Sequence, residues 1–158
     1  MNATWKQIGD LGTGPRFRRI RLKMIQIHIR LLVAEDHAGM REKVVSILEM
    51  DYTVVAAVKD GQQMLDAESR FKPDVVVLDI SMPVVNGIEA ATCLAQRASK
   101  AKIVFLTVHE DPAFLQAALA AGAIGYVIKS RLASDLRFAV SEAFAGRRFI
   151  SPPLDAPS

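Results

Sequence analysis

Short apolar runs alternate along the chain with longer segments in which apolar residues recur every three to four positions. The clearest run is Val-Val-Val-Leu at 75–78, with Pro73 shortly before it and Asp79 directly after it. A run this short and this rich in β-branched residues predicts a strand buried on both faces. Asp79 would then stand where a buried strand ends, which suits chemistry better than packing. The alternative is that Asp79 only caps the following helix.

The same patterns predict the other elements. Apolar runs predict four more strands, at 25–34, 52–58, 102–107 and 125–128. Apolar stripes with helical spacing predict helices at 37–50, 61–71, 87–97, 112–122 and 132–146. In the first strand, residues 25–31 alternate in polarity, and a continuous apolar run follows to residue 34. Five strands that alternate with five helices predict an α/β domain with a parallel sheet and helices on both faces.

Composition narrows the class of protein. The chain has 158 residues, of which 51% are apolar, and this suits one domain with a full core. The single cysteine, Cys93, excludes an internal disulfide framework and a zinc site made of several cysteines. It fits a reducing compartment, and we predict a cytoplasmic location. No apolar run approaches the roughly 18 residues of a membrane span, so no membrane association is expected.

Basic residues are concentrated at the start of the chain. Residues 1–24 hold six basic residues and one acidic residue, whereas the rest of the chain holds 14 basic and 16 acidic residues. We predict that residues 1–24 form a poorly ordered basic leader that could bind polyanions. The alternative is an over-extended gene start, with Met24 as the true first residue. Residues 25–150 would form the folded domain, and residues 151–158 a C-terminal tail or truncated linker.

Polar side chains follow four of the predicted strands. Glu35 and Asp36 follow the first strand, Asp79 the third and Lys129 the fifth, while Thr107 ends the fourth. The carboxyl ends of parallel strands lie at one edge of the sheet, and ligands bind there in open α/β folds. We therefore expect three carboxylates, one hydroxyl and one ammonium group to meet in one cleft.

These groups suit metal-assisted phosphoryl transfer. Three crowded carboxylates repel one another unless a hard cation lies among them. Mg²⁺ prefers oxygen ligands, which Asp36, Asp79 and a backbone carbonyl could supply. A carboxylate can accept a phosphoryl group as an aspartyl phosphate, and this reaction needs positioning and charge neutralisation above all. Lys129 would neutralise one phosphoryl oxygen, and Thr107 would donate a hydrogen bond to another.

The motifs resemble those of the receiver domain of bacterial two-component response regulators. The resemblance covers residues 29–145 and rests on four motifs: Glu-Asp at 35–36, Leu-Asp-Ile-Ser-Met-Pro-Val-Val-Asn-Gly at 78–87, Leu-Thr at 106–107 and Gly-Tyr-Val-Ile-Lys at 125–129. It implies a flavodoxin-like (βα)5 doubly wound parallel sheet with strand order 2-1-3-4-5. Ser130 stands where many receivers have proline after the lysine, so the geometry of that loop would differ.

The resemblance also implies the roles of single residues. Asp79 would take a phosphoryl group from a partner histidine kinase. Asp36, Asp79 and the main-chain carbonyl of Ser81 would bind Mg²⁺, with Glu35 acting through water. Thr107 and Tyr126 would form a switch pair in which Tyr126 turns inward after phosphorylation, and Lys129 would sense the phosphate.

The output of such a receiver is less defined by the sequence. The sequence at 106–152, which ends in Ala-Gly-Arg-Arg-Phe-Ile-Ser-Pro, resembles regulators of the LuxR-type helix-turn-helix class. We expect no specific DNA binding by this chain, because nine residues with three prolines follow Phe149. A protein partner or a second copy would instead bind the surface at 111–145. The alternatives are the receiver part of a truncated transcriptional regulator and a phosphate-independent binding module.

Two further interpretations concern catalysis and histidine. An aspartyl-phosphate phosphatase is disfavoured, because Ser81 stands two residues after Asp79 where a second acid would be needed. We expect a signalling domain with at most weak autophosphatase activity. His28, His37 and His109 are too scattered for a metal site. We interpret His109 as a solvated loop residue, with contact to water or phosphate as the alternative.

Overall fold

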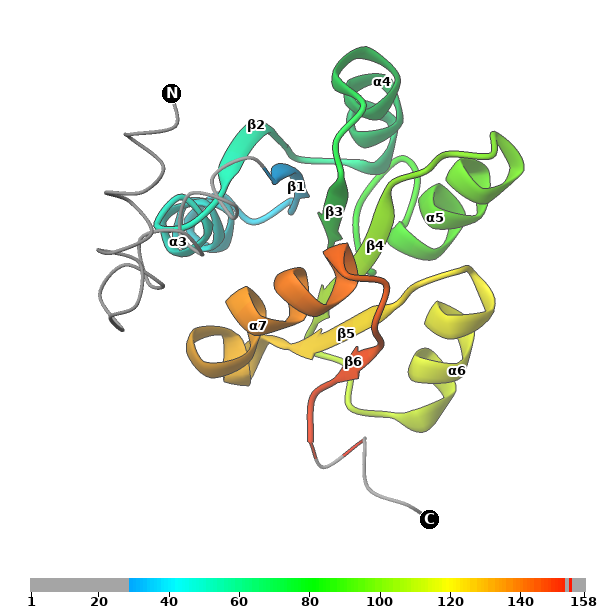
Figure 1. The fold of residues 1–158 in the computed structure, drawn as a ribbon. Helices are drawn as coiled ribbons and strands as arrows, with labels where there is room; N and C mark the ends of the chain where they lie inside the picture. Colours follow the sequence, from blue (N-terminus) through cyan, green and yellow to red (C-terminus); the bar gives the residue numbers. More distant parts are fainter. Residues whose placement is uncertain (1–28, 153, 155–158) are drawn as a thin grey trace, which may run out of the picture.

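Six parallel strands form the centre of the molecule (Figure 1). The structure is a computed structural model and describes residues 29–152 and 154. Its strands are β1 (Arg30–Ala34), β2 (Thr53–Val58), β3 (Val75–Leu78), β4 (Lys102–Thr107), β5 (Gly125–Ile128) and β6 (Phe149–Ile150). Their spatial order is β2-β1-β3-β4-β5-β6. The predicted order of the first five strands is confirmed, and β6 extends the sheet beyond β5.

Helices cover both faces of this sheet (Figure 1). They are α3 (Ala38–Leu48), α4 (Gly61–Phe71), α5 (Gly87–Gln96), α6 (Pro112–Ala120) and α7 (Leu132–Phe144), with the 3₁₀ turn η1 (Lys129–Arg131) before α7. Buried side chains of α4, α5 and α6 pack with one face of the strands, and those of α3 and α7 pack with the other. The result is the three-layer arrangement that the alternating pattern predicts.

Strand β3 lies in the middle of both cores. Val76 and Leu78 belong to the core under α4, α5 and α6, whereas Val75 and Val77 belong to the core under α3 and α7. The prediction of a strand buried on both faces is therefore confirmed. Its neighbours are β1 and β4, and the chain order reverses between β1 and β3. Such a reversal opens a crevice at the carboxyl ends of the strands, which is where Asp79 lies.

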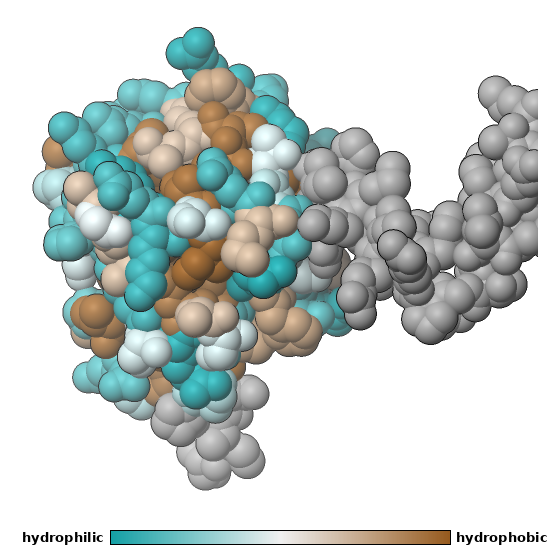
Figure 2. Space-filling model, turned by 90° about the vertical axis from the view of Figure 1, so that its left-hand side faces the viewer, coloured by the Kyte–Doolittle hydropathy of each residue, from teal (hydrophilic) through white to brown (hydrophobic). Residues whose placement is uncertain are grey.

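Strand β2 forms one edge of the sheet and is only partly covered. Its residues are intermediate or exposed, and apolar surface appears among polar residues on the side of the molecule where β2 lies (Figure 2). Among the described residues, β1 begins at Arg30, directly after the buried Ile29. Residues 25–28 of the predicted strand lie outside the described part, as do the predicted leader and most of the predicted tail. Within the described residues, no helix is both long and apolar enough to cross a membrane.

Ser151 joins the end of the described chain to β5 through hydrogen bonds. We placed this residue in a C-terminal tail, but it is completely buried. Its N–H donates to the carbonyl of Tyr126 at 2.9 Å, and its Oγ accepts from the N–H of Ile128 at 3.2 Å. The same Oγ donates to Asp135 Oδ2 at 2.7 Å. The folded unit thus continues past residue 150, and Leu154 packs against the core.

Asp135 is the charged centre of this contact. Burial by itself would raise the pKa of Asp135, but hydrogen bonds from Arg131, Ser151 and Ser134 outweigh it and hold the pKa below its usual value of 3.8. Arg131 Nε donates to Asp135 Oδ2 at 2.8 Å. A carboxyl group whose pKa is lowered by folding stabilises the folded state at every pH above its ordinary pKa.

Replacing Asp135 by Asn should therefore destabilise the domain at neutral pH. Hydrogen bonds to a charged group contribute about 1.5–3 kcal/mol each, so we expect the free energy of unfolding to fall by roughly 1–3 kcal/mol. The stabilisation is lost as pH falls from 3.8 through the lowered pKa of the folded state, so the difference between the two proteins should be smaller near about pH 3 than at neutral pH. Urea unfolding at both pH values measures this, with Asp66→Asn at an exposed position of α4 as the control. A loss of equal size at both pH values would contradict the role of the charge.

Candidate functional site

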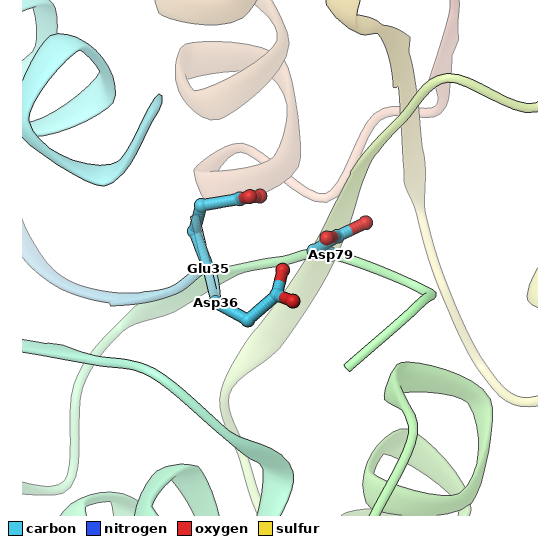
Figure 3. A group of neighbouring side chains, drawn as sticks. All are labelled: Glu35, Asp36 and Asp79. Carbon is cyan, nitrogen blue, oxygen red and sulfur yellow. The ribbon is translucent and has the colours of Figure 1, made fainter. Parts of the chain in front are cut away.

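Three carboxylates meet at the carboxyl edge of the sheet. Glu35 and Asp36 directly follow β1, and Asp79 directly follows β3. Their side chains point toward a common space (Figure 3), and one oxygen from each residue lies within 4.8 Å of the others. Glu35 and Asp79 are buried, whereas Asp36 is exposed. The strand-end pattern thus identified groups that the fold does bring together.

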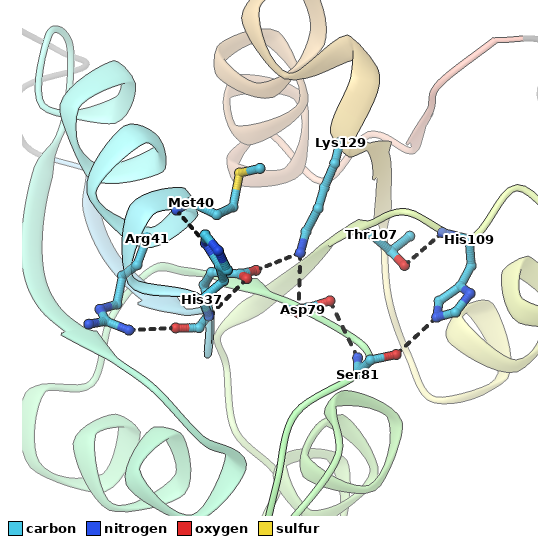
Figure 4. Close-up of polar contacts among 9 residues, drawn as sticks. His37, Met40, Arg41, Asp79, Ser81, Thr107, His109 and Lys129 are labelled. Atoms are coloured by element: carbon cyan, nitrogen blue, oxygen red, sulfur yellow. Dashed lines mark hydrogen bonds and ion pairs between the residues drawn. The ribbon is translucent and has the colours of Figure 1, made fainter.

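Lys129 joins this cluster from the end of β5. Its Nζ lies 2.9 Å from Glu35 Oε2 and 3.3 Å from Asp79 Oδ2 (Figure 4). Burial by itself would lower the pKa of Lys129, but the two carboxylates outweigh it and raise the pKa above its usual value. Lys129 therefore stays protonated and lies between the two buried acids.

The negative charge of Asp79 is only partly compensated by its neighbours. Burial and the nearby charge of Glu35 raise its pKa to about 6, although Lys129 and the N–H of Ser81 act in the opposite direction. A carboxylate with few compensating partners remains available for a cation or for covalent chemistry.

The loop after Asp79 is packed too closely for a side chain at Gly87. A Cβ atom there would lie 2.1 Å from the carbonyl oxygen of Asp79, and the N–H of Gly87 donates to Ile80 at 2.7 Å. Within the loop, Val84 has φ of +68°, a region that branched side chains rarely adopt. Such strain is common at functional sites, where the surrounding structure holds it in place. Asn86 caps α5 and Gly87 is its first residue, so the start of this helix fixes the backbone beneath the acid.

Glu35 is positioned by the start of α3. The N–H of His37 donates to Glu35 Oε1 at 3.2 Å, and Arg41 Nη1 donates to the carbonyl of Glu35 at 3.0 Å. The His37 ring caps α3 by accepting from the N–H of Met40 at 3.2 Å (Figure 4). One oxygen of Glu35 thus faces α3 and the other faces Lys129.

The strand β4 side of the site is organised around His109. Its N–H donates to Thr107 Oγ1 at 3.1 Å, and its carbonyl accepts from the Tyr126 hydroxyl at 2.8 Å. Its ring nitrogen Nε2 makes a 2.9 Å hydrogen bond with Ser81 Oγ (Figure 4). His109 thus lies on a loop and is partly exposed, as expected, but its ring has a hydrogen-bond partner in Ser81. Its partners come from three separate segments, and no spacing in the sequence indicates them.

Tyr126 lies in the interior of the fold. We expected phosphorylation to favour an inward position of its ring, and the side chain is completely buried in this structure. Burial, together with the charge of Asp111, raises the pKa of Tyr126 to about 12, so its hydroxyl is a proton donor at neutral pH. The bond to His109 uses that proton. The Tyr126 ring therefore occupies the inward position in this structure, with its hydroxyl hydrogen-bonded to the carbonyl of His109.

Comparisons with known proteins agree with this geometry. A family model described as the response regulator receiver domain matches residues 31–141. The transcriptional regulatory protein DegU of Brevibacillus brevis is 36% identical over 78% of this chain and 53% of its own length. The nitrate/nitrite response regulator protein NarL of Escherichia coli is 32% identical over 78% of this chain and 58% of its own.

A solved structure shows the same fold in a related protein. The crystal structure of a LuxR-family two-component response regulator from Aurantimonas has a TM-score of 0.76 and is 35% identical, over 79% of this chain and 91% of that chain. The present chain spans about half to two thirds of the length of the curated relatives it matches. The chain therefore belongs to the family of response regulator receiver domains of bacterial two-component systems.

Proposed function

We propose that Asp79 accepts a phosphoryl group from a histidine kinase and that this event switches the binding of a downstream partner. The observation that carries the proposal is the position of Asp79. Its carboxylate lies at the end of the central strand, 3.3 Å from the Lys129 ammonium group and beside two further acids. Receiver domains are signalling domains, and we assign this chain the same role in the cytoplasm, with autophosphatase activity that is weak at most.

The transfer is a displacement at phosphorus. A carboxylate oxygen of Asp79 attacks the phosphorus atom of the kinase phosphohistidine and forms a new P–O bond. The P–N bond to the imidazole breaks, and the imidazole nitrogen retains the electron pair. Lys129 would neutralise charge on a phosphoryl oxygen, and the Thr107 hydroxyl would donate a hydrogen bond to another.

The residues around Asp79 fit a magnesium ion. All the available ligand atoms are oxygens, which Mg²⁺ prefers. Burial and then the charge of Glu35 raise the pKa of Asp79, and a divalent cation would act in the opposite direction. Asp36, Asp79 and the Ser81 carbonyl would hold the ion, with Glu35 acting through water. When bound, Mg²⁺ neutralises charge on the oxygens of the transferred group.

The response would reach the surface through Thr107 and Tyr126. Both contact the main chain of His109, on the loop that leads from β4 to α6. A phosphoryl group that draws the Thr107 hydroxyl away from the His109 N–H would shift this loop and thereby α6. We propose that α6, β5 and α7 form the surface for a protein partner or a second copy of the chain.

Two other functions are alternatives to a phosphorylation-dependent switch of partner binding. Relatives of the chain are named transcriptional regulatory proteins, so the chain could serve as the receiver part of such a regulator. Specific DNA binding is not proposed for the folded domain. Residues after 24 carry 14 basic and 16 acidic side chains, so they offer no excess of positive charge to the phosphates of DNA. A phosphate-independent binding module is disfavoured by the close approach of Asp79 and Lys129.

Phosphorylation should occur at Asp79 and nowhere else. Incubation with acetyl phosphate and Mg²⁺ should add one acid-labile phosphoryl group, which intact-protein mass spectrometry detects. Asp79→Asn removes the nucleophilic oxygen and should abolish the added mass, while the exposed control Asp66→Asn should be labelled like the parent protein. Labelling of Asp79→Asn would show that Asp79 is not the phosphorylated residue.

Magnesium binding should depend on Asp36. Asp36→Asn removes one ligand charge from an exposed position, so the fold should persist while Mg²⁺ affinity falls by roughly 10–100-fold. Titration calorimetry of the variant, the parent protein and Asp66→Asn measures the difference. An unchanged dissociation constant in Asp36→Asn would show that the ion lies elsewhere.

A further inference from the structure

A side-chain hydrogen bond joins the loop after β3, which begins with Asp79, to the loop after β4. Ser81 Oγ and His109 Nε2 are 2.9 Å apart, although the residues are 28 positions apart in the chain. Ser81 lies on the loop after β3, and its N–H donates to Asp79 Oδ1 at 3.3 Å. The hydrogen bond thus begins two residues from the acid and ends on a different loop (Figure 4).

The His109 ring continues the contact to α6. It stacks on the ring of Phe114, with the ring centroids 3.9 Å apart and the planes only 10° from parallel. Phe114 lies in the first turn of α6 and is 37% exposed. The main-chain N–H of Phe114 donates to the carbonyl of Asp111, the N-cap residue of this helix. An unbroken series of contacts therefore runs from Asp79 through Ser81 and His109 to the surface of α6.

We propose that the hydrogen bond between Ser81 and His109, together with the stack on Phe114, is a latch that transmits occupancy of the acidic cluster to α6. The proposal rests on the proposed function, in which a cation on the Ser81 carbonyl and a phosphoryl group on Asp79 reposition residues 79–81. His109 is a positioning residue in this account, because it acts through Ser81 and Phe114. It carries the displacement of one loop to the other.

The latch is separate from the route through Thr107 and Tyr126. Those two side chains contact the main chain of His109, whereas the latch uses only its ring. Removing the Ser81 hydroxyl leaves both main-chain contacts in place. A net hydrogen-bond contribution corresponds to a roughly two- to ten-fold change in an equilibrium, so the latch should carry a measurable part of the response.

Hydrogen exchange across residues 113–118 tests the latch, with Mg²⁺ and beryllofluoride as the phosphoryl mimic. Four proteins are compared: the parent, Ser81→Ala, Ser81→Thr and His109→Phe. Ser81→Thr retains the hydroxyl, and His109→Phe retains an aromatic ring for the stack but loses the hydrogen bond. We expect the probe to change exchange in the parent and in Ser81→Thr. In Ser81→Ala and His109→Phe the change should be roughly two- to ten-fold smaller.

The outcomes separate the latch from the proposed function. Calorimetry first establishes that beryllofluoride binds each protein. If it binds, a response in Ser81→Ala equal to that of the parent, or no response in the parent, overturns the latch. If the parent does not bind it, the proposed function is wrong, and the latch, which rests on it, has nothing to transmit. Ligand-free exchange then still tests the contact itself. Faster exchange of residues 113–118 in Ser81→Ala and His109→Phe than in the parent and Ser81→Thr shows that the hydrogen bond stabilises α6, and equal exchange shows that it does not.

Discussion

The Lys129 ammonium group allows two buried carboxylates to lie side by side. Glu35 and Asp79 come from different strands, and Lys129 contacts both within 3.3 Å. Without this positive charge, burial and mutual repulsion would favour protonation or separation of the acids. The raised pKa of Asp79 shows that the compensation is incomplete. That remaining imbalance gives the cluster its affinity for further positive charge in the proposed function.

The sheet determines where this imbalance is located. The strand order places the ends of β1 and β3 next to each other, and β5 reaches the same edge from the far side of β4. Stability comes from the two cores above and below the strands, which hold the polar ends in register. The connection after β3 carries the strained Val84 and ends at the closely packed Gly87, the first residue of α5. Rigid strands thus position the acids, and loops connect them to the surface.

The parts of this arrangement that follow from local pattern were predictable. The apolar run before Asp79 and the polar residues at the ends of the strands are visible in the sequence, because burial on two faces requires continuous apolar residues. Strand β6 has two residues and no period, so nothing in the sequence indicated it.

Contacts between distant segments were not predictable. The partners of Ser151 and of the His109 ring depend on tertiary distances. The complete burial of Tyr126 is a property of packing in this fold, and motif resemblance does not report it. One ammonium group, that of Lys129, compensates two buried acids. The stability of ligand-free Lys129→Met tests this compensation most directly. We predict a loss of about 2–4 kcal/mol in the free energy of unfolding, because two buried carboxylates lose their partner, and substantial recovery when Glu35→Gln is added. Unchanged stability in Lys129→Met, or no recovery in the double variant, would contradict the account.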